Sequence, residues 1–235
     1  KHERHEGRQG WSRDKYDETY LRKLRNNSLY FKIKKLETIK FSYVIPQVFA
    51  QRVNELDSDI WNTDATFEKG HLYLVEADSG KGKSTFCSYV VGYRHDYSGS
   101  VTFDNDNTKE YDVKEWVDMR QHHISHLFQE LRLFPELTAF ENVEIKNKLT
   151  GFKSRDQIVK WFDMLGIREK LDAKIGRMSF GQQQRVALIR SLVQPFDFIF
   201  ADEPISHLDD TNSAIMAEIM MTEAKAQGAG VIVTS

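Results

Sequence analysis

The segment ADSGKGKST (77–85) constrains the fold most, because it follows an apolar run, HLYLVEA (71–77), and leads into a helix-like stretch, KSTFCSYVVG (83–92). The apolar run predicts a buried strand, so the three pieces form a strand, a loop and a helix in succession. Glycines let the main chain curl tightly, and the amides at a helix N-terminus attract an anion. We therefore expect a phosphate-binding loop in an α/β domain.

Individual side chains of this loop indicate how a nucleotide would be held. Lys83 places a positive charge for the β- and γ-phosphates, and the hydroxyl of Ser84 can ligate Mg²⁺. Such loops usually open with a glycine, but this one has Ala77, which fits only at a negative φ. The alternative is a chance turn rich in glycine, lysine and serine. The predicted nucleotide contacts in the loop are Asp78, Ser79, Gly80, Lys81, Gly82, Lys83, Ser84 and Thr85.

A second element, FDFIFADEP (196–204), is an apolar strand that ends in two adjacent carboxylates. The carboxyl ends of strands are where α/β sheets hold their ligands. Asp202 would support the Mg²⁺ shell, whereas Glu203 would orient and polarise the attacking water. Taken alone, the pair could equally cap a following helix. Its position after a phosphate loop favours the catalytic interpretation.

Strand and helix patterns alternate along the rest of the chain, which favours a mainly parallel sheet. A helical insert is predicted from Gln129 to Ile175, with one apolar stripe at helical spacing. That stripe consists of Ile158, Trp161, Phe162 and Leu165. Strands are predicted twice within 29–45 and once each at 98–103, 196–201 and 231–234, and helices at 182–193 and 214–226.

The order of the motifs resembles that of a known family. The segment MSFGQQQRVALIRSLV (178–193) is similar to the signature and following helix of the ABC transporter ATPases. Gln129, within LFQELRLFPELTAFENV (127–143), resembles the Q-loop, and SHLDD (206–210) resembles the D-loop. Together with the phosphate loop and the acidic strand end, these elements follow the family order across residues 71–210.

The resemblance implies a P-loop NTPase core with a mainly parallel sheet, an antiparallel β lobe and an inserted α-helical subdomain at about 130–180. The ABC ATPase domain would occupy 29–235, after a charged N-terminal extension at 1–28, and its C-terminal end would be truncated. The Q-loop stretch and ADEPISHLDD (201–210) are most similar to the lipoprotein-release, macrolide-export and cell-division branches. The partners of those proteins transmit mechanical force.

The resemblance also implies that ATP is held between two copies joined head to tail. The signature of one copy would reach the nucleotide of the other through the helix tip at Ser179, Gly181 and Gln182. Asp209 would lie at that interface, and Gln129 would reach Mg²⁺ or the attacking water. The implied catalytic residues are Glu203, Lys83 and Gln129, and the implied Mg²⁺ ligands are Ser84, Gln129 and Asp202.

The loop that follows Gln129, residues 130–136, is the expected surface that transmits motion to a membrane subunit. Its apolar residues, Leu131, Leu133 and Phe134, could equally pack in the core. The expected partners are a second ATPase domain, which would be an identical copy, and an integral membrane subunit of the permease type. The chain would then lie in the cytoplasm, peripheral to the inner face of the cell membrane.

Some positions depart from the family pattern. Phe180 stands where the signature has its first glycine, and its ring could crowd the partner's nucleotide or turn outward. A histidine normally follows the last strand, so it is either cut off or replaced by Ser235, and a serine would weaken hydrolysis. For stacking on adenine, Phe49 has a suitable distance from the loop and Tyr43 is the alternative, although an aromatic residue there is more often core.

Three nearby histidines, His122, His123 and His126, suggest a metal site. No companion cysteine or carboxylate spacing supports it, so packed or solvated histidines are the favoured interpretation. Cys87 is the only cysteine, which excludes an internal disulfide and fits a reducing compartment.

The net charge of −2, with acidic and basic residues interleaved, argues against nucleic acid as a partner. No apolar run approaches the roughly 20 residues that cross a bilayer. We expect an ATPase that uses ATP and Mg²⁺. Two alternatives stay open. A soluble ABC ATPase outside transport is disfavoured because no coiled-coil insertion, duplicated domain or basic patch is visible, and a nucleotide-binding module with weak turnover is disfavoured by the presence of Glu203.

Overall fold

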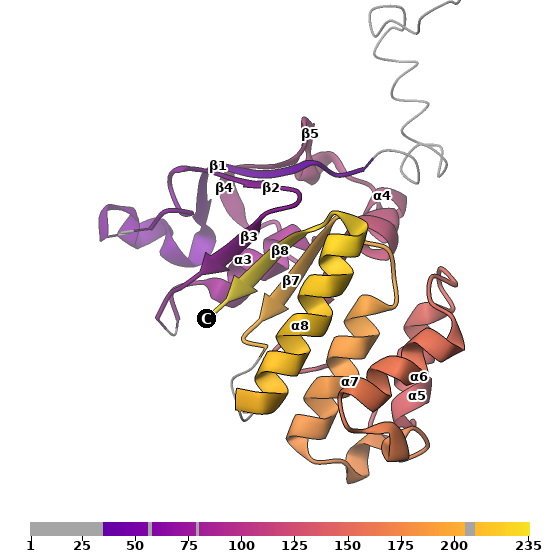
Figure 1. The fold of residues 1–235 in the computed structure, drawn as a ribbon. Coiled ribbons are helices and arrows are strands. Elements are labelled where there is room, and N and C mark those ends of the chain that lie inside the picture. The colour runs from indigo at the N-terminus through magenta and orange to yellow at the C-terminus, as the bar shows by residue number, and fades with distance from the viewer. Residues whose placement is uncertain (1–34, 56–57, 79, 205–209) are drawn as a thin grey trace, which may run out of the picture.

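Two sheets organise the part of the chain that the computed structural model describes, which is residues 35–55, 58–78, 80–204 and 210–235 (Figure 1). The family resemblance predicted a parallel core sheet and an antiparallel lobe, and both are confirmed. The parallel sheet has the order β3-β8-β7-β6 and consists of β3 (Leu72–Val75), β6 (Ile124–Leu127), β7 (Phe198–Asp202) and β8 (Gly230–Thr234). The antiparallel sheet has the order β2-β1-β4-β5 and consists of β1 (Thr38–Pro46), β2 (Asp64–Glu68), β4 (Tyr97–Phe103) and β5 (Asp106–Asn107).

The helices begin with side-chain caps at several N-termini. At each of these caps, the side chain of a Ser, Thr or Asp accepts a hydrogen bond from the backbone N–H three residues later. The Glu or Gln at that later position accepts one in return from the backbone N–H of the cap residue. Both bonds satisfy N–H groups that have no partner within the helix. The helices are α3 (Lys83–Val90), α4 (Val113–Asp118) with a π-helical turn (Met119–His123), α5 (Ala139–Asn147), α6 (Arg155–Met164), α7 (Phe180–Leu192) and α8 (Asp210–Gln227). Short 3₁₀ segments lie at Gln47–Glu55, Thr108–Glu110, Arg168–Lys170 and Ile175–Arg177.

Strand β7 separates two hydrophobic cores, because successive side chains of a strand point to opposite faces. Phe198 and Phe200 face the core shared with the antiparallel sheet and α3, whereas Ile199 and Ala201 face the core formed by α5 to α8. All four side chains are fully buried. This two-sided burial explains why the strand is a continuous apolar run in the sequence. Figure 1 shows α7 and α8 on one side of the parallel sheet, with the antiparallel sheet above it.

Within the described residues, the structure contains the predicted helices and strands with small shifts in their bounds. The stripe on α6 is confirmed, since Ile158, Phe162 and Leu165 are almost completely buried and Trp161 packs against the same core. The π-helical extension of α4 was not predicted. Helices α5 and α6 lie inside the segment expected to form the helical subdomain, while the division of the chain into domains stays a prediction.

The expected burial of the strand before the phosphate loop was wrong. Leu72 and Leu74 of β3 are 60% and 59% exposed, because β3 is the last strand of the parallel sheet and pairs with β8 along one edge within the described residues. The two strands expected within 29–45 are also not both described. Strand β1 begins at Thr38, and residues 29–34 lie outside the described part, as does the predicted extension at 1–28.

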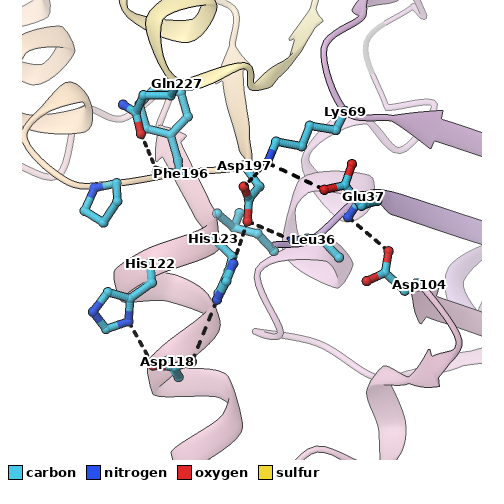
Figure 2. Close-up of polar contacts among 12 residues, drawn as sticks. Leu36, Glu37, Lys69, Asp104, Asp118, His122, His123, Phe196, Asp197 and Gln227 are labelled. Carbon is cyan, nitrogen blue, oxygen red and sulfur yellow. Dashed lines mark hydrogen bonds and ion pairs between the residues drawn. The ribbon is translucent and has the colours of Figure 1, made fainter. Parts of the chain in front are cut away.

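A buried carboxylate joins the two sheets at the start of β7 (Figure 2). Asp197 accepts a hydrogen bond from the backbone N–H of Leu36 at 2.8 Å, and it pairs with the ammonium of Lys69. Leu36 and Lys69 belong to the antiparallel side, whereas the imidazole of His123, 2.6 Å from Asp197, precedes β6 of the parallel sheet. The carboxylate therefore connects three segments that are distant in the sequence.

The charge of Asp197 is stabilised by these partners. Burial on its own raises the pKa of this carboxyl, but the hydrogen bonds from His123, Lys69 and the Leu36 amide outweigh it and hold the pKa below its usual value. Asp118 extends the group, because it lies 2.8 Å from the imidazole of His122 and 3.8 Å from that of His123. We call Asp197, Lys69, His123 and Asp118 the lower junction.

Candidate functional site

The phosphate loop has the backbone shape that its sequence predicts. Gly80 and Gly82 have φ values of 81° and 100°, a region that favours glycine, and Gly82 is the N-terminal cap of α3. A Cβ at Gly82 would also lie 3.0 Å from the ring of Phe49. Ala77 is not among the described residues with a positive φ, so the missing glycine is tolerated. Its N–H donates to the carbonyl of Ser235 at 3.2 Å.

Three predicted catalytic residues meet beside this loop. The ammonium of Lys83 donates to the carbonyl of Ala77 at 2.5 Å and lies 3.3 Å from a carboxylate oxygen of Glu203. The amide of Gln129 donates to the other oxygen of Glu203 at 2.8 Å. These residues come from the first turn of α3 and from just beyond β7 and β6, so the carboxyl edge of the parallel sheet assembles them.

Glu203 has an unusual backbone for a residue that is not glycine. Its φ is 45°, in the left-handed region, and its N–H donates to the carbonyl of Thr234 at 3.2 Å. Such conformations cost of order 1–3 kcal/mol and are found mainly at functional sites. Here the turn directs the carboxylate to Lys83 and Gln129 instead of letting the strand continue.

Asp202 is buried one residue earlier, with 6% of its surface exposed. Burial is the main cause that raises its pKa, and the nearby charges of Glu203 and Glu130 add to it, although a hydrogen bond from the Thr234 hydroxyl at 2.5 Å opposes the shift. A positive charge brought to this point would be stabilised. The predicted Mg²⁺ ligands fit the ion, because the carboxylate of Asp202, the hydroxyl of Ser84 and the amide oxygen of Gln129 are all hard oxygen donors.

A cavity of about 680 Å³ opens next to the loop, beneath the antiparallel sheet. Trp61 and Tyr73 line it together with Asp78, Lys81 and Lys83. Trp61 was not singled out from the sequence, and no spacing marked it. It is buried, and its indole N–H donates to the carbonyl of Lys81 at 3.2 Å.

The two aromatic residues expected near adenine have different surroundings. Phe49 packs against Gly82, with its ring 6.5 Å from that of Trp61, and Tyr43 is 61% exposed on a bulge of β1 where its φ is 48°. Their roles in binding adenine stay predictions.

The tip of the signature helix α7 faces solvent. Ser179 is exposed and Phe180 is 46% exposed, so the phenyl ring is not buried in its own subunit. The hydroxyl oxygen of Ser179 accepts the N–H of Gln182 at 3.3 Å, and the Gln182 side chain accepts the N–H of Ser179 at 3.0 Å. Gly181 follows in the first turn. Ser79, and Asp209 of the predicted D-loop, lie outside the described residues.

The loop after Gln129 divides between core and surface. Leu131 is buried with a φ of 58°, and Leu133 packs partly buried against the helical core, whereas Phe134 is 50% exposed. Asn142 holds the exposed turn, since its side chain accepts the N–H of Phe134 at 2.7 Å and donates to its carbonyl at 3.0 Å. Phe134 therefore presents an apolar ring on a rigid support.

The three histidines do not form one metal cluster. His122 bonds to Asp118 and His123 bonds to Asp197, as Figure 2 shows. His126 lies instead on β6, where one donor atom each from Cys87, His126 and Asp202 lie within 4.8 Å of one another. Sequence reasoning missed this arrangement, because the three residues belong to separate elements with no characteristic spacing.

Comparison with known proteins agrees with this geometry. The family model described as "ABC transporter" matches residues 60–206. The lipoprotein-releasing system ATP-binding protein LolD of Colwellia psychrerythraea is 32% identical over 197 residues, which is 82% of this chain and 74% of that protein. The macrolide export ATP-binding/permease protein MacB of Rhodopseudomonas palustris is 34% identical over 175 residues, 73% of this chain and 27% of MacB.

A solved structure is similar over most of the fold. The dimeric structure of MJ0796, a bacterial ABC transporter cassette, matches with a TM-score of 0.71 and 26% identity over 84% of this chain and 87% of that one. The same cassette has also been solved in a post-hydrolysis state bound to ADP and Pi. From the matched family, these relatives and the phosphate loop itself, we conclude that this chain is an ATP-binding domain of the ABC transporter family, in the branch of the lipoprotein-release and macrolide-export proteins.

Proposed function

We propose that this chain is an ATPase subunit that binds Mg²⁺ and ATP between two copies and transfers the closure of the pair to an integral membrane partner. The observation that carries the proposal is the meeting of Lys83, Glu203 and Gln129 at the N-terminus of α3. A charge that neutralises phosphate, a carboxylate that accepts a proton and an amide that orients it are the parts that phosphoryl transfer to water needs.

The contacts of Lys83 suggest how the site would respond to a nucleotide. Its ammonium is held by the carbonyl of Ala77 and by Glu203, so it is already aimed across the loop. Phosphate oxygens are stronger partners for an ammonium than a carbonyl is. The ammonium of Lys83 would therefore move to the phosphate oxygens. The carboxylate of Glu203, still hydrogen-bonded by Gln129, would then be free to accept a proton from water. Mg²⁺, held by Asp202, Ser84 and Gln129, would neutralise charge on the phosphates.

The exposed tip of α7 supports the pairing of two copies. The Ser179 oxygen accepts the backbone N–H of Gln182, so the Ser179 hydrogen can donate to a phosphate of the facing copy, together with the backbone amide of Gly181. The related cassette MJ0796 is a dimer in its solved form. Phe180 would stand at the edge of this contact, and the family resemblance implies that Asp209 would lie there too.

Phe134 and the loop at 130–136 are the surface proposed for the membrane partner. LolD belongs to a lipoprotein-releasing system, and the MacB protein combines ATP-binding and permease parts in one chain. None of the described helices is sufficiently long and apolar to span a bilayer. A permease-like subunit would supply the membrane-spanning part, by analogy with these relatives, and this chain would bind it from the cytoplasmic side.

The test is the variant Glu203→Gln in the full chain. It should bind ATP normally, accumulate as a nucleotide-bound dimer in size-exclusion chromatography and hydrolyse ATP about 10²-fold more slowly or worse, because the general base is lost. The matched control is Glu169→Gln, which removes the charge of an exposed glutamate outside the site.

Turnover that is unchanged in Glu203→Gln would remove this mechanism. Wild-type protein with no measurable hydrolysis, alone or with a membrane partner, would instead support the module with weak turnover. Activity that never depends on a membrane subunit would support the soluble ABC ATPase.

A further inference from the structure

We propose that Cys87, His126 and Asp202 form an inhibitory binding site for zinc or a similar divalent transition metal, beneath the nucleotide site. One donor atom from each residue lies within 4.8 Å of the other two. Around a tetrahedral zinc ion the ligand atoms stand roughly 3.5 Å apart, given metal bonds of about 2.0–2.3 Å. Small side-chain movements would therefore complete the set.

The three donors come from rigid neighbouring elements. Cys87 is in the second turn of α3, His126 is on β6 and Asp202 ends β7, which pairs with β6 in parallel. Cys87 and Asp202 are buried, at 2% and 6% exposure. Sites on helices and strands hold ligands in place better than sites on loops.

The chemistry of the donors selects the metal. A thiolate, an imidazole and a carboxylate suit zinc and its neighbours, and three protein ligands leave the fourth position for water. Mg²⁺ requires oxygen ligands in an octahedral arrangement, so the thiol and the imidazole are of little use to it. This set is thus distinct from the oxygen donors assigned to Mg²⁺, although both contain Asp202.

His126 supplies an independent observation. Both of its ring nitrogens are buried and have no hydrogen-bond partner among the described residues. Its ring packs 4.0 Å from that of Phe128, centroid to centroid. Leaving buried polar atoms unpaired destabilises the fold, so a packing role alone would be better filled by an apolar side chain. Burial, helped by Arg132 and Lys146, lowers the pKa of His126 to about 3, which leaves the ring neutral and able to bind a metal.

The balance of charge also favours a cation at this point. Cys87 would lose its proton to solvent when the metal binds, so the thiolate and Asp202 together would offset the two charges of the ion. Burial raises the pKa of the free thiol, which means that it stays protonated until a metal arrives. Glu203 and Glu130 add negative charge around Asp202, while Arg132 and Lys146 oppose it on the side of His126.

Occupation of the site would compete with catalysis. A metal that draws Asp202 towards Cys87 takes away the carboxylate proposed for the Mg²⁺ shell, and it ties that carboxylate to the helix that begins at the phosphate loop. This inhibitory part rests on the proposed function, whereas metal binding itself does not. The result would be an ATPase that is arrested when the free zinc concentration rises.

Binding is tested with metal-free full chain and Co²⁺, which takes zinc ligands and reports them by its absorption. We expect a thiolate-to-cobalt charge-transfer band that Zn²⁺ abolishes by displacement. Cys87→Ser should lose the band, and His126→Phe, which keeps a ring of similar size, should weaken binding by at least about 10-fold, since even changes to outer-sphere partners cost this much. His71→Ala, an exposed histidine, is the matched control and should bind as the wild type does.

The activity arm uses Zn²⁺ at fixed Mg²⁺ and ATP. Wild-type hydrolysis should fall and return when a chelator is added, whereas Cys87→Ser and His126→Phe should resist. Circular dichroism and melting temperature check that the variants are folded, and Cys87→Ala and His126→Leu replace any that are not. A cobalt spectrum without a thiolate band, or equal affinity in the wild type and both variants, overturns the site. An inactive wild type would end the proposed function but leave the spectra decisive for the metal.

Discussion

Strand β7 has a buried carboxylate at each end, and the two carboxylates differ in the hydrogen-bond partners that the chain gives them. Asp197, just before the strand, accepts bonds from Leu36, Lys69 and His123. Asp202, the last residue, accepts a hydroxyl from Thr234 and has Glu203 as its neighbour. Both carboxylates are 6% exposed, so burial does not explain the difference.

The directions of the two pKa shifts express that difference. Burial raises the pKa of both carboxyls, but at Asp197 the hydrogen bonds from His123, Lys69 and the Leu36 amide outweigh it and lower the pKa, whereas at Asp202 burial dominates. A carboxylate that the chain has fully paired holds the fold together. At Asp202 the charge of Lys83 and the Thr234 hydroxyl do not offset burial, so this carboxylate can still gain from a bound cation. The lower junction therefore stabilises the fold, whereas the end of β7 at Asp202 is suited to a ligand.

The largest expected effect is on stability, from the lower junction. Asp197→Ala leaves the buried ammonium of Lys69 with only the carboxylate of Glu37, 3.9 Å away, and leaves the His123 imidazole without its acceptor, so the free energy of unfolding should fall by about 3–5 kcal/mol. Asp202→Asn should change it by less than about 1 kcal/mol, because it removes an unfavourable charge and keeps the shape. Urea unfolding of both variants measures the contrast, and similar losses would show that the two ends are equivalent.

Dependence on pH sharpens the same comparison. The pKa of Asp197 is lower in the folded than in the unfolded chain. Asp197 therefore stabilises the folded state fully above the ordinary aspartate pKa, and this stabilisation is lost as pH falls through the folded pKa. The pKa of Asp202 is shifted in the opposite direction. A raised pKa favours the folded state at low pH, and this stabilisation is lost as pH rises through the folded pKa of Asp202. Asp197→Asn should therefore flatten the loss of stability in acid, and an unchanged acid limb would contradict the assigned role.

The next effect is on nucleotide affinity. Lys83→Ala should weaken ATP binding roughly 10- to 100-fold, because a hydrogen bond between charged groups contributes about 1.5–3 kcal/mol. Stability should hardly change, as the ion pair with Glu203 is partly exposed. Calorimetric titration gives the affinity, and Lys160→Ala on the exposed face of α6 is the control. Equal affinity in Lys83→Ala and the wild type would place the phosphates elsewhere.

The smallest effect separates two helix caps with the same chemistry. Ser179 and Ser154 each accept an N–H three residues on, from Gln182 and Gln157. Replacing either serine with alanine should cost about 1 kcal/mol of stability, the usual value of an N-cap. Only Ser179→Ala should also lower ATP-driven dimerisation and hydrolysis, because Ser154 caps α6 away from the signature. Equal loss of activity in the two variants would reduce Ser179 to a structural cap.

Local sequence was sufficient for the elements whose chemistry is contained in a short segment. The phosphate loop was predictable because Gly80 and Gly82 need positive φ values and a helix must follow them. Strand β7 was predictable because burial on both faces requires a continuous apolar run. The helix at 180–192 was predictable from its motif, and its serine cap operates within one turn.

Contacts between distant segments were decided by the tertiary structure. The exposure of Leu72 and Leu74 depends on β3 standing at the edge of its sheet, and the lining of the cavity by Trp61 depends on how the antiparallel sheet is placed over the loop. The meeting of His126 with Cys87 and Asp202 has the same origin. The physical reason is that hydrogen-bond caps and turns act over a few residues, whereas pairing of strands joins residues without regard to their separation along the chain.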